Sequence, residues 1–243
     1  LDYKKIKYEK LPTTAGKVMM LKYFDEFLLY GGFPEIVESR NGEELRQLYQ
    51  DILIKDLIVR FKIKDAKSFR ELALYLLSNS GRPVSYNNLK KVLGIKSATT
   101  VKNYIEYLAE SYLNFSISKF DYSLKKQIKN DKKIFSIDTG LINFVSFLFA
   151  PESGRILENV VFLELKRRGK EIYYYLGAGG CDFLIKEGRE IIEAIQVTEN
   201  LSAGNEKREI SGLVEAAIKH NVKKLLVLTR NQDYEITTGG KKI

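Results

Sequence analysis

The chain has 243 residues, of which 44% are hydrophobic, enough to bury one large core or several smaller ones. Its 40 Lys and Arg residues exceed its 31 Asp and Glu residues, and the formal net charge is +9. The single cysteine, Cys181, and the single histidine, His220, exclude a disulfide framework and a zinc site made of Cys and His ligands. The sequence has no apolar run of about 18 residues and no signal peptide, so we expect a cytoplasmic protein with no membrane partner.

The basic excess is concentrated in the N-terminal part of the chain. Residues 1–150 hold 25 Lys and Arg residues against 17 Asp and Glu residues, whereas residues 151–243 hold 15 against 14. This difference indicates at least two domains and places any polyanionic partner on the first. The alternative is that a lysine-rich surface serves only to keep the protein in solution.

Residues 1–65 are predicted to form a helical connector. Apolar residues recur at helical spacing in "KVMMLKYFDEFLLYGGFPEIV" as far as Leu29. Gly31 and Gly32 permit a tight reversal of the chain, and Pro34 fits the start of a new helix. A further helix is predicted for "EELRQLYQDILIKDLIVRF". Its apolar stripe is expected to consist of Leu45, Leu48, Ile52 and Leu57.

Residues 66–149 are predicted to form a winged helix-turn-helix. The first helix is "SFRELALYLLSNSG", and the second and third are expected to begin at the capping residues Ser85 and Ser97. Gly94 ends the second helix, and a Leu-Gly-Ile turn before a helix that opens with small polar residues is typical of the motif. Two strand-like runs then flank a lysine-rich loop, which is typical of a wing.

This arrangement predicts DNA binding by the third helix and the wing. The first turn of the third helix would face the major groove, and the lysines of the loop would meet phosphates and release counterions. The candidate DNA-binding residues are Thr99, Thr100, Lys102, Asn103, Lys125, Lys126, Lys129, Lys132 and Lys133. Winged helices also serve as protein–protein interaction modules, and that alternative stays open.

Residues 150–243 are predicted to form an α/β domain. An amphipathic helix, "GRILENVVFLELKRRG", precedes the strands "EIYYYLG", "CDFLI", "EIIEAIQVT" and "KKLLVLT". A helix, "KREISGLVEAAIKH", lies between the third and fourth strands and ends at His220, where a capping role is expected. This order of elements predicts an α/β fold with a mixed central sheet.

Several of these segments resemble, in order, the C-terminal region of a prokaryotic, mainly archaeal, family of AAA-type P-loop ATPases. They include "LLYGGFPEIV", "YQDILIKDLIVRF", "TVKNYIEYLAESYL", "FDYSLKKQIKNDKKIFSIDTGLINFV" and "LENVVFLELKRRGKEIYYY". The resemblance runs from about Tyr23 to Thr229. It implies an ATPase domain followed by a helical connector (1–65), a winged helix-turn-helix (66–149) and a restriction-endonuclease-like α/β domain (150–243).

The chain itself contains no P-loop. "TTAGKVMM" has a Gly-Lys pair, but Val18 occupies the position where Ser or Thr must hold magnesium, and "GAGG" lacks the lysine. We therefore assign no ATP-binding residue to this chain. ATP is expected to bind only through an N-terminal ATPase domain that is missing here, and that domain is an expected partner. A homo-oligomer is a further partner state that the sequence leaves open.

The resemblance also maps the positions of a nuclease site onto this chain. Glu158 falls at the helix position and Asp182 at the first-strand position, where both would hold a metal. Gln196 and Thr198 fall where the second strand of such enzymes has Glu and Lys. Glutamine brings no negative charge to a metal, and threonine does not stabilise a developing anion as an ammonium does. No cofactor is therefore assigned, and Mg²⁺ is expected only if this site is competent.

The leading functional prediction is the DNA-binding and positioning portion of a AAA-type ATPase with a degenerate nuclease-like domain. The first rival is an active metal-dependent DNA nuclease or branched-DNA resolvase that uses Glu158, Asp182 and Gln196. The second rival is a protein-interaction module for which DNA is irrelevant.

Overall fold

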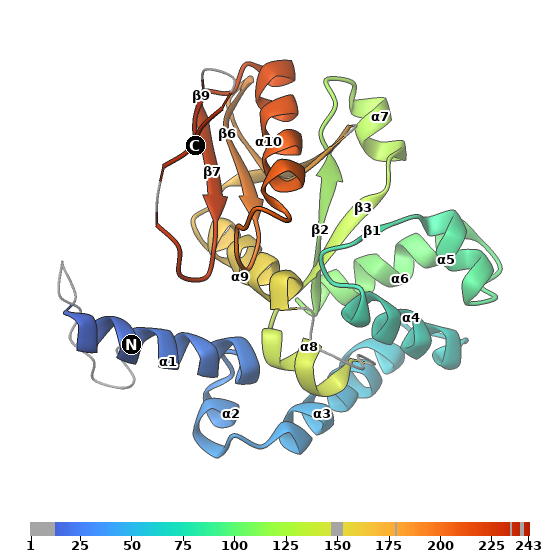
Figure 1. Ribbon diagram of the computed structural model, residues 1–243. Coiled ribbons are helices and arrows are strands. Elements are labelled where there is room, and N and C mark those ends of the chain that lie inside the picture. The colour runs from blue at the N-terminus through green and yellow to red at the C-terminus, as the bar shows by residue number, and fades with distance from the viewer. Residues whose placement is uncertain (1–12, 147–152, 178, 234, 239–240) are drawn as a thin grey trace.

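A computed structural model of the chain describes residues 13–146, 153–177, 179–233, 235–238 and 241–243 (Figure 1). The first 12 residues of the expected connector lie outside this part. The helical elements are α1 (Thr14–Tyr30), α2 (Pro34–Ser39), α3 (Gly42–Asp51), the π-helix η1 (Ile52–Val59), α4 (Ala66–Ser78), α5 (Tyr86–Val92), α6 (Ala98–Glu110), α7 (Leu124–Lys129), α8 (Thr139–Val145), α9 (Ser153–Arg167) and α10 (Glu206–His220). The strands are β1 (Pro83–Val84), β2 (Asn114–Lys119), β3 (Lys132–Ser136), β4 (Glu171–Leu176), β5 (Gly180–Glu187), β6 (Glu190–Val197), β7 (Lys224–Leu228), β8 (Thr237–Thr238) and β9 (Lys241–Lys242).

One seven-stranded sheet organises the molecule, in the order β1-β3-β2-β4-β5-β6-β7. Strand β2 pairs in parallel with β4, and β6 pairs in parallel with β7, whereas the other neighbours are antiparallel. The prediction of an α/β fold with a mixed central sheet is confirmed. The sheet also crosses the expected domain boundary near residue 150, because β1, β2 and β3 belong to the winged-helix region and continue into the α/β sheet.

The two faces of the C-terminal part of the sheet are covered by different helices. Leu184 and Ala194 pack with apolar residues of α10 in one buried cluster. Phe183, Ile195 and Val197 pack with apolar residues of α9 in another. Side chains alternate between the two faces of a strand. Strand β6 therefore buries residues on both of its faces, and its polar Gln196 lies on the face that α10 covers.

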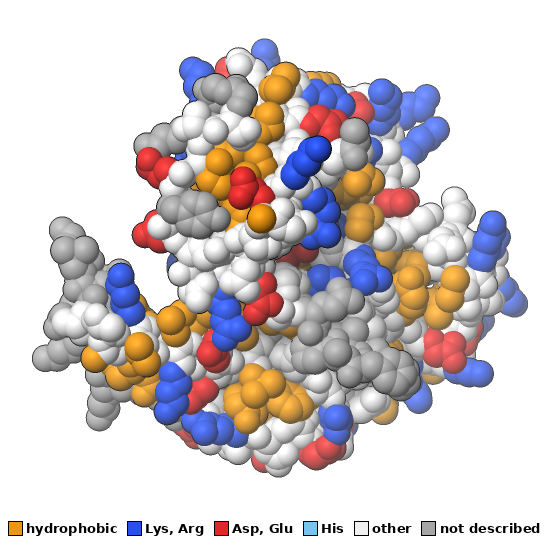
Figure 2. Space-filling model, viewed as in Figure 1, with side chains coloured by type: hydrophobic (Ala, Val, Ile, Leu, Met, Phe, Trp, Pro, Cys, Tyr) orange, Lys and Arg blue, Asp and Glu red, His pale blue; other side chains and the backbone are white. Residues whose placement is uncertain are grey.

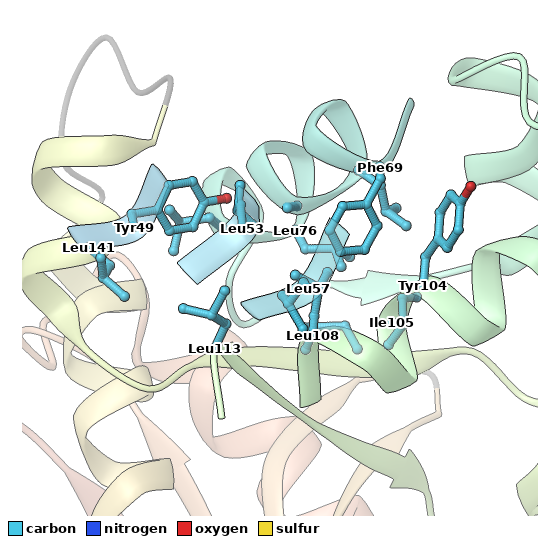
Figure 3. Close-up of a cluster of buried hydrophobic side chains, with 14 of the residues drawn as sticks. Tyr49, Leu53, Leu57, Phe69, Leu76, Tyr104, Ile105, Leu108, Leu113 and Leu141 are labelled. Atoms are coloured by element: carbon cyan, nitrogen blue, oxygen red, sulfur yellow. The ribbon is translucent and has the colours of Figure 1, made fainter. Parts of the chain in front are cut away.

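The helices of the N-terminal part pack on a core that includes α3, η1, α4 and α6 (Figure 3). The predicted single helix after residue 42 is α3 continued by the π-helix η1. Its buried residues are Leu45, Tyr49, Leu53 and Leu57. Of the expected stripe, Leu45 and Leu57 are buried and Ile52 is half-buried and packs against the same core. Leu48 was wrong, because it is exposed at the edge of the buried face.

The predicted caps and breaks are confirmed. Helix α1 ends at Gly31, whose φ is +78°, and Pro34 is at the start of α2. The side chain of Ser85 accepts a hydrogen bond from the Asn88 N–H, and that of Ser97 accepts one from the Thr100 N–H. These bonds satisfy N–H groups that a helix leaves free at its start.

In the region of the expected wing loop, the structure shows the short helix α7 between β2 and β3. Within the described part of the chain, no helix is long and apolar enough to cross a membrane.

Candidate functional site

Three charged side chains from three different elements meet on the face of the sheet that α9 covers. The Lys133 Nζ on β3 lies 2.5 Å from Glu158 Oε1 on α9 and 3.0 Å from Asp182 Oδ1 on β5. Their side chains are only 8%, 9% and 17% exposed, respectively. The two carboxylates expected from the resemblance are thus brought together, with a lysine between them that the resemblance did not assign to the site.

An irregularity in β5 orients Asp182 toward this lysine. The pairing of β4 with β5 joins Tyr173 to Leu184 and Tyr175 to Cys181. Two residues of β5, Asp182 and Phe183, therefore oppose the single residue Tyr174 of β4. Such a β-bulge bends a strand and changes the direction of a side chain. Since Phe183 packs with residues of α9, the bulge turns this part of β5, including Asp182, toward the helix that carries Glu158.

A buried amide holds the strand of Lys133 against the helix of Glu158. Asn159 is fully buried, and its Oδ1 accepts hydrogen bonds from the Ser136 N–H at 2.9 Å and the Ser80 hydroxyl at 2.7 Å. Its Nδ2 donates to the Ser136 carbonyl at 3.0 Å. Asn159 directly follows Glu158, so these bonds fix the helix where the carboxylate must lie. A Cβ atom at the neighbouring Gly81 would lie 3.0 Å from Glu158 Oε2.

The position of Lys133 corrects its expected role as a DNA contact from an exposed loop. Lys133 is 7% exposed and belongs to strand β3, where it follows Lys132 and precedes the buried Ile134 and Phe135. Its ammonium is already paired with two carboxylates and does not reach a phosphate. The signal in the sequence was the apolar run after Lys133, which indicates a strand residue and not a loop residue.

The charges of the cluster influence one another because they are buried together. Burial lowers the pKa of Lys133, but the charges of Asp182 and Glu158 outweigh burial and raise it. Burial, and then the negative charge of Asp182, raise the pKa of Glu158 to about 8, against the opposing effect of Lys133. One ammonium does not balance two carboxylates, so the cluster favours an additional proton on Glu158.

The two second-strand positions do not complete a metal site. Gln196 Oε1 accepts a hydrogen bond from the Asp182 backbone N–H at 3.2 Å, and its Nε2 donates to Glu209 Oε2 at 2.8 Å. The Thr198 hydroxyl donates to the Asn200 carbonyl at 3.3 Å. Gln196 therefore holds the backbone of Asp182 through a hydrogen bond, and the Thr198 hydroxyl is engaged by the loop that follows β6.

The residues of this cluster do not fit a divalent metal as the structure has them. Asp182 Oδ2 accepts the Val197 N–H at 3.0 Å, and its other oxygen faces Lys133. The described ranges contain no group of three or more His, Cys, Asp or Glu residues that could hold a metal ion. A metal bound by Glu158 and Asp182 would have to displace the lysine.

The exposed lysines of the wing lie on and beside α7. Lys125, Lys126 and Lys129 are exposed, and Figure 2 shows Lys and Arg side chains gathered where α7 lies in Figure 1. Lys126 lies 3.7 Å from Asp121. Lys132 is half-buried and donates to Ser118 Oγ at 3.1 Å and to the Gln127 carbonyl at 2.5 Å. Three of the five expected wing lysines are therefore exposed, and one of these, Lys126, is paired with Asp121.

The first turns of α6 present the other expected DNA contacts. Thr99, Lys102 and Asn103 are exposed, and Lys102 lies 3.5 Å from Glu106 on the same helix. The Thr100 hydroxyl is instead hydrogen-bonded to Ser97 Oγ at 2.9 Å, so it serves the start of the helix.

Helix α6 and the wing adjoin each other. Burial lowers the pKa of Lys132, and the positive charge of Lys102 lowers it further, against the opposing effect of Asp131. The charge of Lys102 on α6 therefore acts on Lys132, at the start of β3. The exposed lysines among the expected DNA contacts thus come from two elements, Lys102 from α6 and Lys125, Lys126 and Lys129 from α7.

His220 lies at the end of α10, as expected, but packs among aromatic rings. Its ring contacts Phe120, Tyr122 and Tyr175, with centroids 5.0 to 5.8 Å apart. Burial, and then the nearby Lys219, lower the pKa of His220 despite the opposing charge of Asp121. The helix is closed by Asn221, whose φ is +53°. The expected capping role was wrong: the His220 Nδ1 faces the Tyr122 hydroxyl at 3.4 Å, and its Nε2 is buried with no hydrogen-bond partner in the described structure.

Comparison with known proteins places the chain among longer relatives. The uncharacterized protein MJ1544 of Methanocaldococcus jannaschii is 34% identical over 256 residues, which cover 98% of this chain and 56% of that protein. An uncharacterized protein of Haemophilus influenzae is 28% identical over 217 residues, which cover 85% of this chain and 52% of that protein. The chain thus spans about half the length of these relatives. No solved structure matches it. Residues 21–152, just over half of the chain, match the family described as Domain of unknown function (DUF8612). The chain belongs to this family.

Proposed function

We propose that this chain is the DNA-binding and positioning portion of a AAA-type ATPase, with a nuclease-like domain that lacks metal-dependent chemistry. The observation that carries the proposal is a set of exposed lysines on the winged helix. They are Lys102 on the first turns of α6, and Lys125, Lys126 and Lys129 on the wing helix α7. A winged helix with lysines on its wing is suited to a groove and its phosphates.

The expected DNA contacts divide into two kinds. Lys102, Lys125, Lys126 and Lys129 would meet phosphates and supply affinity through counterion release. Thr99 and Asn103 lie near the start of α6, and their hydroxyl and amide groups suit the edges of bases in the major groove. The lysines would thus supply affinity for any sequence, while α6 would supply preference among sequences.

The ATPase part of the proposal rests on the length of the relatives and on the resemblance. This chain spans about half of each relative, and the sequence printed here has no P-loop. We propose that an ATPase domain lies in the other half, and that α1 joins it to the winged helix. We also place the protein in the cytoplasm, where a free buried thiol such as Cys181 stays reduced.

The experiment is a fluorescence-anisotropy titration of labelled duplex DNA at several salt concentrations. The triple variant Lys125→Gln/Lys126→Gln/Lys129→Gln should bind more weakly at low salt and show a shallower salt dependence. A matched control, Lys170→Gln/Lys207→Gln/Lys223→Gln, removes three exposed lysines of the C-terminal part and should bind like the unmodified chain. Equal losses in the two triple variants would contradict the placement of the interface on α7.

A protein partner is the second candidate, because α7 also exposes apolar side chains. Tyr122, Leu124 and Ile128 are 75%, 69% and 64% exposed, and Leu124 and Ile128 lie one turn apart on the same helix. Large exposed apolar residues that lie together are typical of protein contacts. The variant Leu124→Ser/Ile128→Ser separates the candidates. It should leave the salt dependence of DNA binding unchanged if the lysines carry the interaction.

A further inference from the structure

We propose that Lys133 takes the place of a divalent metal ion between Glu158 and Asp182, so that the intact chain binds no metal at this site. The inference deepens the part of the proposed function that denies metal-dependent chemistry to the nuclease-like domain, and it does not require DNA binding. It rests on the positions of three side chains and on the groups that surround them.

The geometry of the lysine resembles that of a bound cation. The ammonium nitrogen lies 2.5 Å from one carboxylate oxygen and 3.0 Å from the other. The likeness lies in the placement of one positive charge between two carboxylates, since metal-to-oxygen distances of roughly 2.0 to 2.6 Å are shorter than the 3.0 Å contact with Asp182. The two carboxylates lie 24 residues apart along the chain, on α9 and β5, and the bulge in β5 accompanies the turn of Asp182 toward Lys133. The site therefore has the form of a cation site whose cation is part of the chain.

The groups around the ammonium suit a lysine better than a hydrated metal. The Lys133 Nζ lies 6.0 Å from the centroid of the Phe135 ring and 5.9 Å from that of Phe183. Aromatic faces attract an ammonium group but offer no oxygen ligand. Magnesium keeps several water ligands when it binds to proteins, and those waters would have to occupy the space taken by these rings and by the lysine stem.

The remaining polar groups near the carboxylates are already engaged. The Val197 N–H binds Asp182 Oδ2, and Gln196 binds the Asp182 N–H and Glu209. Gln196 thus offers no free carbonyl oxygen to a metal. Without Lys133, however, one oxygen from each carboxylate would lose its ammonium partner, while the charge of Arg155 would still act on Glu158. Removal of the lysine should therefore uncover a weak site for a divalent ion.

The test compares melting temperatures of the full chain in EDTA and in increasing Mn²⁺ or Mg²⁺. We expect the melting temperature of the unmodified chain to be the same in EDTA, in Mn²⁺ and in Mg²⁺. Lys133→Met should melt at a lower temperature in EDTA, and Mn²⁺ should raise that temperature in a saturable manner, because a ligand that binds only the folded state stabilises it. Lys132→Met removes the adjacent lysine without touching the carboxylates and should show no response to metal.

The variant Lys133→Met/Asp182→Asn tests whether the metal binds at this site. It lacks one of the two carboxylates, so the stabilisation by Mn²⁺ should be lost. Lys133→Met/Glu158→Gln lacks the other carboxylate and removes one charge of each sign, so the net charge of the cluster is unchanged. It likewise retains one carboxylate and one amide oxygen, so Mn²⁺ should not raise its melting temperature either.

Calorimetric titration of the unmodified chain with Mn²⁺ needs no variant to fold. The expected result is no binding that depends on Asp182. Binding of one Mn²⁺ that disappears in Asp182→Asn would show that a metal displaces Lys133, and the proposal would be wrong. A folded Lys133→Met variant, with both carboxylates in place, whose melting temperature does not respond to Mn²⁺ would contradict it equally.

Discussion

Asn159 binds both backbone groups of Ser136, accepting its N–H at 2.9 Å and donating to its carbonyl at 3.0 Å. The side-chain amide thereby makes the two hydrogen bonds that a residue of a neighbouring strand would make at the end of β3. It comes from α9, directly after Glu158, whereas Ser136 lies three residues after Lys133 on β3. This pair of bonds is what aligns the helix of the carboxylate with the strand of the ammonium.

Asn159→Ala should therefore destabilise the fold strongly. The change leaves the Ser136 carbonyl and the Ser80 hydroxyl buried without this partner, whereas the Ser136 N–H keeps its bond to Ser80 Oγ at 3.1 Å. Each buried group that loses its partner costs about 1–3 kcal/mol. We expect the free energy of unfolding to fall by at least about 2 kcal/mol in urea titrations. Asn87→Ala, at an exposed position of α5, should change it by less than about 0.5 kcal/mol. Similar losses at the two positions would show that Asn159 does not hold the site.

Glu158 should make stability depend on pH in an unusual direction. Burial and then Asp182 raise the pKa of Glu158 to about 8 in the folded chain, against about 4.3 in an unfolded chain. Between these values the folded state holds a proton that the unfolded state releases, so the free energy of unfolding falls as pH rises from about 5 to about 8. Glu158→Gln does not titrate and should lack this contribution. Urea titrations across the window measure the difference, and parallel pH profiles for both proteins would refute the raised pKa.

Gly31→Ala should loosen the attachment of α1. Gly31 has φ +78° and ψ −157°, a region open essentially to glycine alone, and an added Cβ would lie 2.0 Å from Asp138 Oδ1. We expect a loss of at least about 2 kcal/mol in the free energy of unfolding. Gly94→Ala is the matched control, since φ there is +64° but nothing lies within 4 Å of the added atom. The control should lose only about 1 kcal/mol, and an equal loss in both would exclude the contact with Asp138 as the cause.

Lys102 should contribute to DNA binding as a single phosphate contact. Lys102→Gln should weaken binding to all sequences about equally and lower the slope of log affinity against log salt by about 1. Glu106→Gln removes the partner of Lys102 without removing its charge, and it should not lower the slope. An unchanged slope in Lys102→Gln would place Lys102 outside the interface.

The local features of the fold could be predicted from the sequence, because their causes are local. Ser85 and Ser97 cap helices through bonds to residues three positions ahead. Gly31 ends α1 through a conformation that needs glycine, and the β5–β6 hairpin follows from two apolar runs around a Gly-containing turn. The mixed sheet followed from the order of these elements.

The buried cluster could be predicted only in part, since it depends on contacts between distant segments. The resemblance brought Glu158 and Asp182 to one site, but Lys133 looked like a loop lysine beside four others. Its burial depends on β2 pairing with β4, which carries the hairpin of the wing into the α/β sheet. The bulge at Asp182 is equally a result of pairing with β4, and no pattern within β5 reveals it.

The most direct test of the account is a cleavage assay under conditions where binding is demonstrated. Labelled duplex, single-stranded and branched DNA would be incubated with saturating protein in Mg²⁺ and then Mn²⁺, with Asp182→Ala beside the unmodified chain. The account predicts that the DNA is bound and stays intact in every case. Cleavage by the unmodified chain that disappears in Asp182→Ala would contradict it, since Glu158 and Asp182 would then hold a working metal despite Lys133.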